Sequence, residues 1–429
     1  MVSATQPFET GRTFPARSLD FWFDYTCPYA YLGSTQAPAL AARMGVELTY
    51  RPLLLGGVFR ANDTPQKLFA TLAPAKAEHN MADMQRWAKR FGVTLTMPAD
   101  HPLRSVEALR ATLATGVDPR VVDAFFRAYW IDNADISDRG VVAKVVASCG
   151  HDAARILDAI ETPVIKDDLR ARTDEAVALG IFGVPAWVVD GTHLYWGQDR
   201  VKFVEGCCAR EGERKSETGT GESESESEGE SKSERVLDVY WDFSSPFAYV
   251  GAKQVEEVAR RTGARVSWHP LLLGGLFKSI GTAEVPLATF SAAKQRYILK
   301  DVERWAAYAG VPFRFPTRFP AQSLRALRVY LALPEAHRAS YRDAVLRACW
   351  ADDRDISDDA VLSSCIADET VARAALASAN SDVVKSELRN LTEAAAKRGV
   401  FGVPTFGVGR ELFWGQDRLE LVEEALSPA

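Results

Sequence analysis

The chain has 429 residues, of which 47% are hydrophobic and 25% are charged, and its formal net charge is −6. This length and composition predict two globular domains of roughly 200 residues, each able to bury a core, and exclude a fibrous protein. The negative charge disfavours a nucleic-acid partner. No apolar run approaches the roughly 20 residues that span a bilayer, so we expect a cytoplasmic protein that binds neither nucleic acid nor membrane.

Most of the sequence occurs twice in the same order. DYTCPYAYLG at residues 24–33 returns as DFSSPFAYVG at 242–251, and FGVP followed by WGQDR occurs within 182–200 and again within 401–418. Repetition over a whole domain length indicates a duplicated domain and not a short solenoid repeat. The copies differ most sharply before the first proline, where one has a cysteine and the other a serine.

Segments of biased composition separate and precede the two copies. Residues 209–235 consist mainly of Glu, Ser, Gly and Lys, and they offer no large apolar residue that could order them. We interpret them as a flexible acidic linker between the first copy, residues 19–208, and the second, residues 236–429. A functional acidic interaction tail is the alternative. Residues 1–18 lack an apolar segment after a basic one, so we expect a flexible arm and not a signal peptide.

Each copy starts with an alternating apolar segment, at residues 19–24 and 236–242, which predicts a β-strand. Pro28 and Pro246 follow in positions where proline is tolerated, the first turn of a helix. In the first copy this helix is expected to end near residue 44. The pattern therefore predicts a strand that leads directly into a helix at the start of each copy.

The rest of each copy continues the same order. A second strand is predicted at residues 46–51 and 265–269, then a long helical stretch, a Pro-led strand, a Gly-containing turn, a second short strand and a final helix. This order predicts an α/β fold, a thioredoxin-like domain with an inserted all-helical subdomain. The insertions are expected at about 65–180 and about 283–399.

Cys27 and Ser245 are the candidate reactive residues because they directly precede a helix that follows a strand. Unpaired backbone N–H groups and the positive end of the helix dipole stabilise a thiolate there, so Cys27 is a reactive thiol, a buried and inert one, or a simple capping-position residue. Ser245 is either a helix N-cap or a donor to another molecule's thiolate. The six cysteines show no CxxC pair and no zinc-type Cys/His spacing, so we expect no disulfide framework and no metal site.

Two further motifs could bind a ligand. If the peptide bonds before Pro185 and Pro404 are cis, the backbones of Val184 and Val403 face an incoming extended peptide; ordinary turn prolines are the alternative. The Asp-Arg pairs that follow are either caps and solvated charges or groups that hold the two ends of a zwitterionic peptide. These pairs are Asp199-Arg200 and Asp417-Arg418.

A third matched cluster lies in the helical insertions. Lys76 and Lys294 are either solvated or face a cleft where they attract an anionic substrate. The tryptophans that follow are expected in the core, and Asp83 and Arg86 are expected to form a surface ion pair along the helix. The first copy has His79 where the second has tyrosine.

These motifs, in this order, resemble the 2-hydroxychromene-2-carboxylate isomerases, which are relatives of the kappa-class glutathione transferases in the DsbA-like thioredoxin superfamily. The resemblance covers nearly all of both copies and implies glutathione as the cofactor. It implies that Ser245 hydrogen-bonds the glutathione sulfur. The residues that it implies for glutathione binding are Val403, Pro404, Gln416, Asp417 and Arg418, with Val184, Pro185, Gln198, Asp199 and Arg200 as their counterparts in the first copy.

The resemblance also implies a reaction, in which the thiolate adds reversibly to a conjugated enone of an aromatic substrate and permits cis/trans isomerisation. The implied substrate residues are Lys294, Tyr297 and Trp414, with Lys76 and Trp196 in the first copy. Our leading hypothesis is such an isomerase, used in the catabolism of aromatic compounds, with the second copy as the more orthodox site.

Three alternatives remain open at the level of the sequence. The protein could be a kappa-like transferase or peroxidase that consumes glutathione. It could be a single-cysteine thiol–disulfide oxidoreductase, because Ala30 stands where a resolving cysteine would be needed for a dithiol cycle. One copy could be non-catalytic, since relatives commonly pair as homodimers and the two copies are expected to pack as an intramolecular pseudo-dimer.

Overall fold

The computed structural model describes residues 18–66, 68–207 and 235–427. These residues form two compact units, one with residues 18–66 and 87–207 and the other with residues 68–86 and 235–427. Most of each unit is one copy of the repeat, but the second unit also includes a short stretch of the first copy. Residues 1–17 of the expected N-terminal arm and residues 209–234 of the expected acidic linker lie outside the described residues, whereas Ser18 already belongs to a strand.

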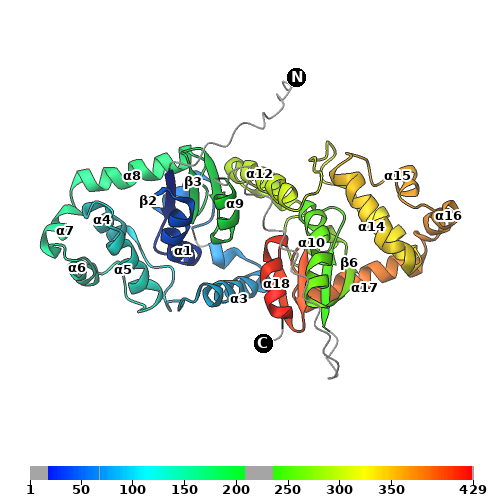
Figure 1. Ribbon diagram of the computed structural model, residues 1–429, viewed down its shortest axis with the longest axis horizontal. Coiled ribbons are helices and arrows are strands. Elements are labelled where there is room, and N and C mark those ends of the chain that lie inside the picture. The colour runs from blue at the N-terminus through cyan, green and yellow to red at the C-terminus, as the bar shows by residue number, and fades with distance from the viewer. Residues whose placement is uncertain (1–17, 67, 208–234, 428–429) are drawn as a thin grey trace, which may run out of the picture. The chain divides into compact units, whose positions relative to one another are not determined.

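Both copies follow the predicted order of strand, helix, strand, helices, strand, strand and helix (Figure 1). The elements of the first copy are β1 (Ser18–Phe23), α1 (Pro28–Met44), β2 (Glu47–Pro52), α2 (Leu55–Ala61), the 3₁₀ helix η1 (Leu68–Thr71), α3 (Pro74–Phe91), α4 (Val106–Ala114), α5 (Pro119–Trp130), α6 (Arg139–Ser148), α7 (Ala153–Ala159), α8 (Pro163–Ala178), β3 (Ala186–Val189), β4 (His193–Trp196), η2 (Gln198–Arg200) and α9 (Val201–Gly206).

The second copy repeats this plan. Its elements are β5 (Val236–Trp241), α10 (Pro246–Thr262), β6 (Arg265–Pro270), α11 (Leu273–Ser279), η3 (Pro286–Thr289), α12 (Ala292–Tyr308), α13 (Leu324–Ala332), α14 (Glu335–Trp350), α15 (Asp359–Ser364), α16 (Glu369–Ser378), α17 (Asp382–Arg398), β7 (Thr405–Val408), β8 (Glu411–Trp414), η4 (Gln416–Arg418) and α18 (Leu419–Leu426).

Each copy has a four-stranded mixed sheet, with the strand orders β2-β1-β3-β4 and β6-β5-β7-β8. The first two strands of each copy are parallel, and the last two are antiparallel to their neighbours. Figure 1 shows the early strand β2, in blue, in the same sheet region as the later β3, in green. In the second sheet Tyr240 pairs with Thr405, which brings the turn before β7 beside the end of β5.

Local sequence explains where the first helix of each copy begins and ends. Pro28 and Pro246 lie in the first turn, as predicted, where the missing N–H would have no helical partner. Gly45 and Gly263 end the helices in the left-handed conformation, with φ of 65° and 67°. These boundaries fix the residue that precedes each helix, which is Cys27 in one copy and Ser245 in the other.

Helices fill the span between the second and third strands of each copy, where the insertion was predicted. They start at Leu55 and Leu273, directly after the second strands, and continue to Ala178 and Arg398. The exact limits of the inserted subdomain remain a prediction. Within the described residues, no helix is both long and apolar enough to cross a membrane.

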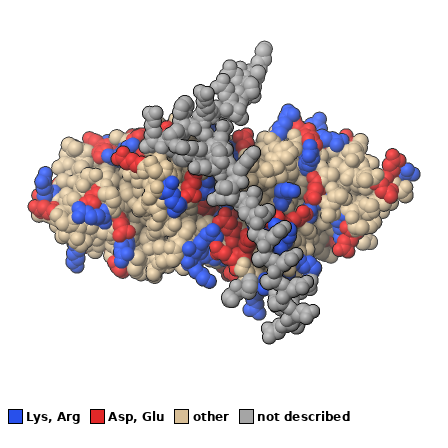
Figure 2. All heavy atoms as spheres, in the orientation of Figure 1, with Lys and Arg blue, Asp and Glu red and all other residues tan. Residues whose placement is uncertain are grey.

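Acidic and basic side chains are intermixed on the face of the molecule drawn in Figure 2. Such mixing is typical of a solvated protein surface. Two matched ion pairs join α1 to α9 and α10 to α18. Arg43 contacts Glu205, and Arg261 contacts Glu423.

Candidate functional site

Ser245 lies at the N-terminus of helix α10, where the chain leaves strand β5. It has extended backbone angles, its Oγ accepts a hydrogen bond from the Ala248 N–H at 3.2 Å, and only 4% of the residue is exposed. The Ser245 hydroxyl donates to the carbonyl oxygen of Val403, also at 3.2 Å. The N-cap interpretation is therefore confirmed. The hydroxyl proton is directed at the Val403 carbonyl. To donate to a bound thiolate, the hydroxyl would have to give up this hydrogen bond.

The loop before Ser245 is held by a buried carboxylate. Asp242 accepts from the backbone N–H groups of Ser244, at 2.9 Å, and Leu273, at 2.7 Å. Burial raises the pKa of the Asp242 carboxyl, and the N–H of Ser244 opposes this shift. The first copy repeats the arrangement, because Asp24 accepts from the N–H groups of Thr26 and Leu55.

A buried tryptophan from the insertion holds the same loop. The indole N–H of Trp350 donates to the carbonyl oxygen of Phe243 at 2.8 Å, and that of Trp130 donates to Tyr25 at 2.8 Å. No functional role was expected for these aspartates and tryptophans from the sequence alone. Their identity in both copies, at nearly the same spacing from the reactive position, was the signal that could have found them.

The peptide bonds from Val184 to Pro185 and from Val403 to Pro404 are cis, which is one of the two alternatives that the sequence left open. Gly251 allows helix α10 to pack closely here, because a Cβ at this position would lie 3.5 Å from Pro404 Cγ and 3.4 Å from Gln416 Cβ. The Gly415 N–H donates to the Pro404 carbonyl at 2.9 Å. The structure thus brings together Pro404, Gln416 and the start of helix α10, although they lie far apart in the sequence.

Arg418 is engaged in ion pairs and is not a solvated charge. Its guanidinium contacts the Asp83 carboxylate at 2.8 and 3.1 Å, and that of Asp417 at 3.3 Å. In the first copy Arg200 contacts Asp199 at 2.9 Å, and both side chains are less than a tenth exposed. The expected surface pair of Asp83 with Arg86 is wrong. Asp83 is 2% exposed and faces Arg418, because a buried carboxylate requires a close cation.

Cys27 occupies the position of Ser245 but has a different hydrogen-bonding pattern. Its side chain forms no helix cap, and its thiol donates to the Val184 carbonyl oxygen at 3.1 Å. Burial raises the pKa of the Cys27 thiol to about 12, against the opposing N–H groups of Ala30 and Tyr29. Of the interpretations of Cys27, the structure supports the buried thiol.

This protonation state predicts a slow reaction with alkylating agents. At pH 8 we expect iodoacetamide to modify Cys27 about 100-fold more slowly than free glutathione, because only the thiolate reacts. The rate should still rise between pH 8 and 10, since the thiol loses its proton only as the pH approaches its raised pKa. Peptide mass spectrometry separates Cys27 from the other cysteines. A rate that levels off below pH 8 would contradict the prediction.

Two of the lysines predicted to bind substrate lie over aromatic rings of the second unit. The Lys76 ammonium lies 5.0 Å from the ring centre of Trp414, and that of Lys294 lies 4.0 Å from the ring of Phe290. Burial and, to a smaller extent, the charge of Lys76 lower the pKa of Lys294 to about 8. Burial also lowers the pKa of Lys76. Lys76 is therefore grouped with the second copy's candidate site, not with the first copy's as the sequence analysis expected.

The remaining predicted substrate residues are packed against other side chains. The Tyr297 hydroxyl donates to Asp301 at 3.3 Å, and only 5% of the residue is exposed. Trp196 packs on Phe182, with ring centres 4.9 Å apart, as Trp414 packs on Phe401 at 5.0 Å. These two tryptophans cover the Gly-Val-Pro turns in the same way in both copies.

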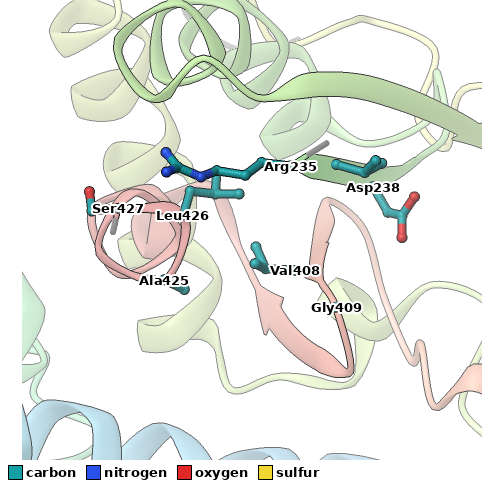
Figure 3. A pocket seen from close by; sticks show the side chains of 8 residues that line it. Arg235, Asp238, Val408, Gly409, Ala425, Leu426 and Ser427 are labelled. Carbon is teal, nitrogen blue, oxygen red and sulfur yellow. The ribbon is translucent and has the colours of Figure 1, made fainter. Parts of the chain in front are cut away.

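A surface hollow of the second unit lies away from this site. It has a volume of about 360 Å³ and lies between the start of β5, the end of β7 and the end of α18 (Figure 3). Ser245 follows the opposite end of β5. Among the described residues, no group of three or more His, Cys, Asp and Glu side chains could hold a metal ion.

Comparisons with known proteins agree with the duplicated fold. The family model described as DSBA-like thioredoxin domain matches residues 18–207 and again residues 236–427. The chain is similar to a 2-hydroxychromene-2-carboxylate isomerase of Sphingobium xenophagum, with 29% identity over 45% of this chain and 98% of the relative.

Two more proteins are similar to parts of this chain. Glutathione S-transferase kappa 1 of Rattus norvegicus is 27% identical over 44% of this chain and 89% of the relative. A solved structure of a 2-hydroxychromene-2-carboxylate isomerase is 28% identical, with a TM-score of 0.39, over 44% of this chain and 94% of that chain.

Proposed function

Because the chain belongs to the family of DSBA-like thioredoxin domains, we propose that it is a glutathione-dependent cis/trans isomerase and that its second copy carries the reacting site. The observation that carries the proposal is Ser245. It combines a hydroxyl donor with the N-terminus of a helix, next to a cis proline. The relatives named as isomerases and kappa transferases support enzyme activity of this kind.

The residues around Ser245 fit a small peptide with a thiol. The hydroxyl of Ser245 and the N–H groups of the first helical turn would stabilise negative charge on sulfur. The backbone of Val403 would pair with the peptide, and Gln416 and Asp417 would hold its γ-glutamyl end. In the first copy, the Nε2 atom of Gln198 is buried without a hydrogen-bond partner in the described structure, which fits an acceptor atom on a ligand.

Glutathione, when bound, would supply a thiolate that adds reversibly to a conjugated enone, so that a double bond becomes a single bond able to rotate. Ser245 would donate its hydrogen bond to the sulfur and hold it at the start of α10. Lys294 and Trp414 would bind an anionic aromatic substrate through charge and ring contact. Tyr297 is held by Asp301 and would position the residues around it.

The test is an isomerisation assay with a trans-benzylidenepyruvate-type enone and a trace of glutathione. We expect many turnovers for each glutathione molecule, with the total thiol unchanged, because addition and elimination return it. Net loss of thiol would favour the second candidate, a kappa-like transferase, which the similarity to a kappa transferase supports. Turnover without any thiol would exclude both candidates.

A further inference from the structure

Side chains from helix α3 of the first copy form hydrogen bonds with the edge strand of the second sheet. Strand β8 is last in the order β6-β5-β7-β8. Within this unit, Arg86 donates to the carbonyl oxygen of Leu412 at 2.8 Å, and the backbone N–H of Trp414 donates to Nε2 of His79 at 3.0 Å. Leu412 and Trp414 are two residues apart, so these groups lie on the same edge of the strand.

The hydrogen bond from Trp414 determines which nitrogen of His79 carries the proton. A backbone N–H can only donate, so Nε2 must be the unprotonated acceptor and a neutral ring must carry its proton on Nδ1. Burial lowers the pKa of His79 to about 4, while the nearby Asp83 opposes and the guanidinium groups of Arg418 and Arg86 reinforce the shift. The ring is therefore neutral at pH 7, with an N–H donor at Nδ1.

That donor has no hydrogen-bond acceptor in the described structure. His79 is 9% exposed, and its Nδ1 is buried without a partner. The neighbouring Asn80 raises the pKa of His79, but its side chain forms no hydrogen bond of ordinary geometry with Nδ1. Buried donors are nearly always satisfied by protein, water or a ligand, and an acceptor oxygen of a ligand would satisfy this one.

The surroundings of His79 define which ligand would supply that oxygen. Its ring centre lies 5.3 Å from that of Phe401 and 6.5 Å from that of Trp414. Lys76 lies one helical turn before His79, over the Trp414 ring, and its charge acts on Lys294. Two ammonium groups that repel each other are stabilised by an anion, and the aromatic rings offer contact area for a planar molecule.

The cluster adjoins the candidate reacting site along the chain. A Cβ at Gly402 would lie 2.7 Å from the indole nitrogen of Trp414, so this ring covers the residue just before Val403. Val403 in turn accepts the hydrogen bond from Ser245. A molecule held by His79 and Lys76 would therefore bind next to the turn that carries the Ser245 contact.

We propose that His79 of the first copy binds substrate for the second copy, by donating from Nδ1 to a carboxylate oxygen of an aromatic acid whose charge is met by Lys76 and Lys294. This inference rests on the proposed function for the identity of the site. It adds a residue whose counterpart in the second copy is Tyr297, which bonds to Asp301 instead. The composite site makes the two copies unequal, because a donor from one serves the other.

The experiment measures binding without glutathione, using the full-length protein and calorimetry. The probes are trans-cinnamate and its neutral analogue trans-cinnamamide. We expect His79→Phe to weaken cinnamate binding about tenfold and cinnamamide binding less than about twofold, because only the carboxylate accepts a charge-assisted hydrogen bond. Imidazole ¹⁵N spectra of the wild type should show the His79 proton on Nδ1.

A second variant guards against loss of structure. In His79→Gln the amide oxygen can accept from Trp414 and the amide nitrogen can donate, so cinnamate binding should stay within about threefold of the wild type. Equal weakening of both probes in His79→Phe, unchanged cinnamate binding, or no cinnamate binding by the wild type would overturn the inference. Since no thiol is present, such a failure leaves the proposed isomerase untouched, and a failed isomerisation assay leaves the binding result valid.

Discussion

Replacing Ser245 with alanine should lower kcat/KM for glutathione-dependent isomerisation by about 100-fold, the usual effect of removing one hydrogen-bond donor to a reacting anion. The hydroxyl lies 3.2 Å from both the Val403 oxygen and the Ala248 nitrogen, at the start of helix α10. It is therefore placed to turn toward a bound sulfur. Alanine keeps the backbone but cannot donate. The measurement is the initial rate with a trans-enone at several glutathione concentrations.

Loss of the helix cap must be separated from loss of the donor. Removing an N-cap serine costs about 1 kcal/mol of stability in its own right. Ser381→Ala is the matched control, because Ser381 caps α17 through the Val384 N–H at 3.4 Å. We expect it to lower the stability by a similar amount and to leave kcat/KM unchanged. Equal activity losses in both variants would show that Ser245 acts only as a cap.

Replacing Asp83 with alanine should lower the free energy of unfolding by about 3 kcal/mol, because it removes the main ion-pair partner of the largely buried Arg418 guanidinium. The Asp83 and Arg418 side chains are 3% and 13% exposed and are joined at 2.8 Å. The effect should fall at the lower end of the range for broken buried pairs, since Arg418 keeps Asp417 at 3.3 Å. Urea denaturation followed by tryptophan fluorescence measures the loss.

Two further variants test whether the buried ion pair causes the loss of stability in Asp83→Ala. Asp167→Ala removes an exposed ion pair, with side chains that are 67% and 74% exposed, and should cost less than about 0.5 kcal/mol. The double variant Asp83→Leu with Arg418→Met should recover part of the loss, because no charge is then left buried without its partner. If Asp83→Ala costs no more than Asp167→Ala, the buried pair does not stabilise the fold.

The parts of the fold that follow local rules could be predicted from the sequence. Pro28 and Pro246 mark helix starts because of their fixed φ, and the order of alternating and helical segments gave the strand and helix sequence. Comparison of the two copies placed Cys27 and Ser245 at one structural position. These features depend on short stretches of chain, which is why the pattern was sufficient.

The partners of charged side chains could not be predicted in the same way. The three-residue spacing of Asp83 and Arg86 fits a helical ion pair, yet Asp83 binds Arg418, which is 335 positions away. The state of Cys27 also depended on packing. A helix N-terminus stabilises the thiolate, but burial destabilises it more, and only the fold shows which effect is larger.

Because residues 68–86 belong to the second unit, they affect where the chain can be cut to give a folded fragment. A fragment that begins at Arg235 would contain a whole copy of the repeat, yet it would expose the Leu412 carbonyl and the Trp414 N–H that Arg86 and His79 meet. Unpaired groups on an edge strand invite association with other chains. The second sequence repeat is thus not a complete structural unit by itself, and a truncation at the repeat boundary would produce an aggregation-prone protein.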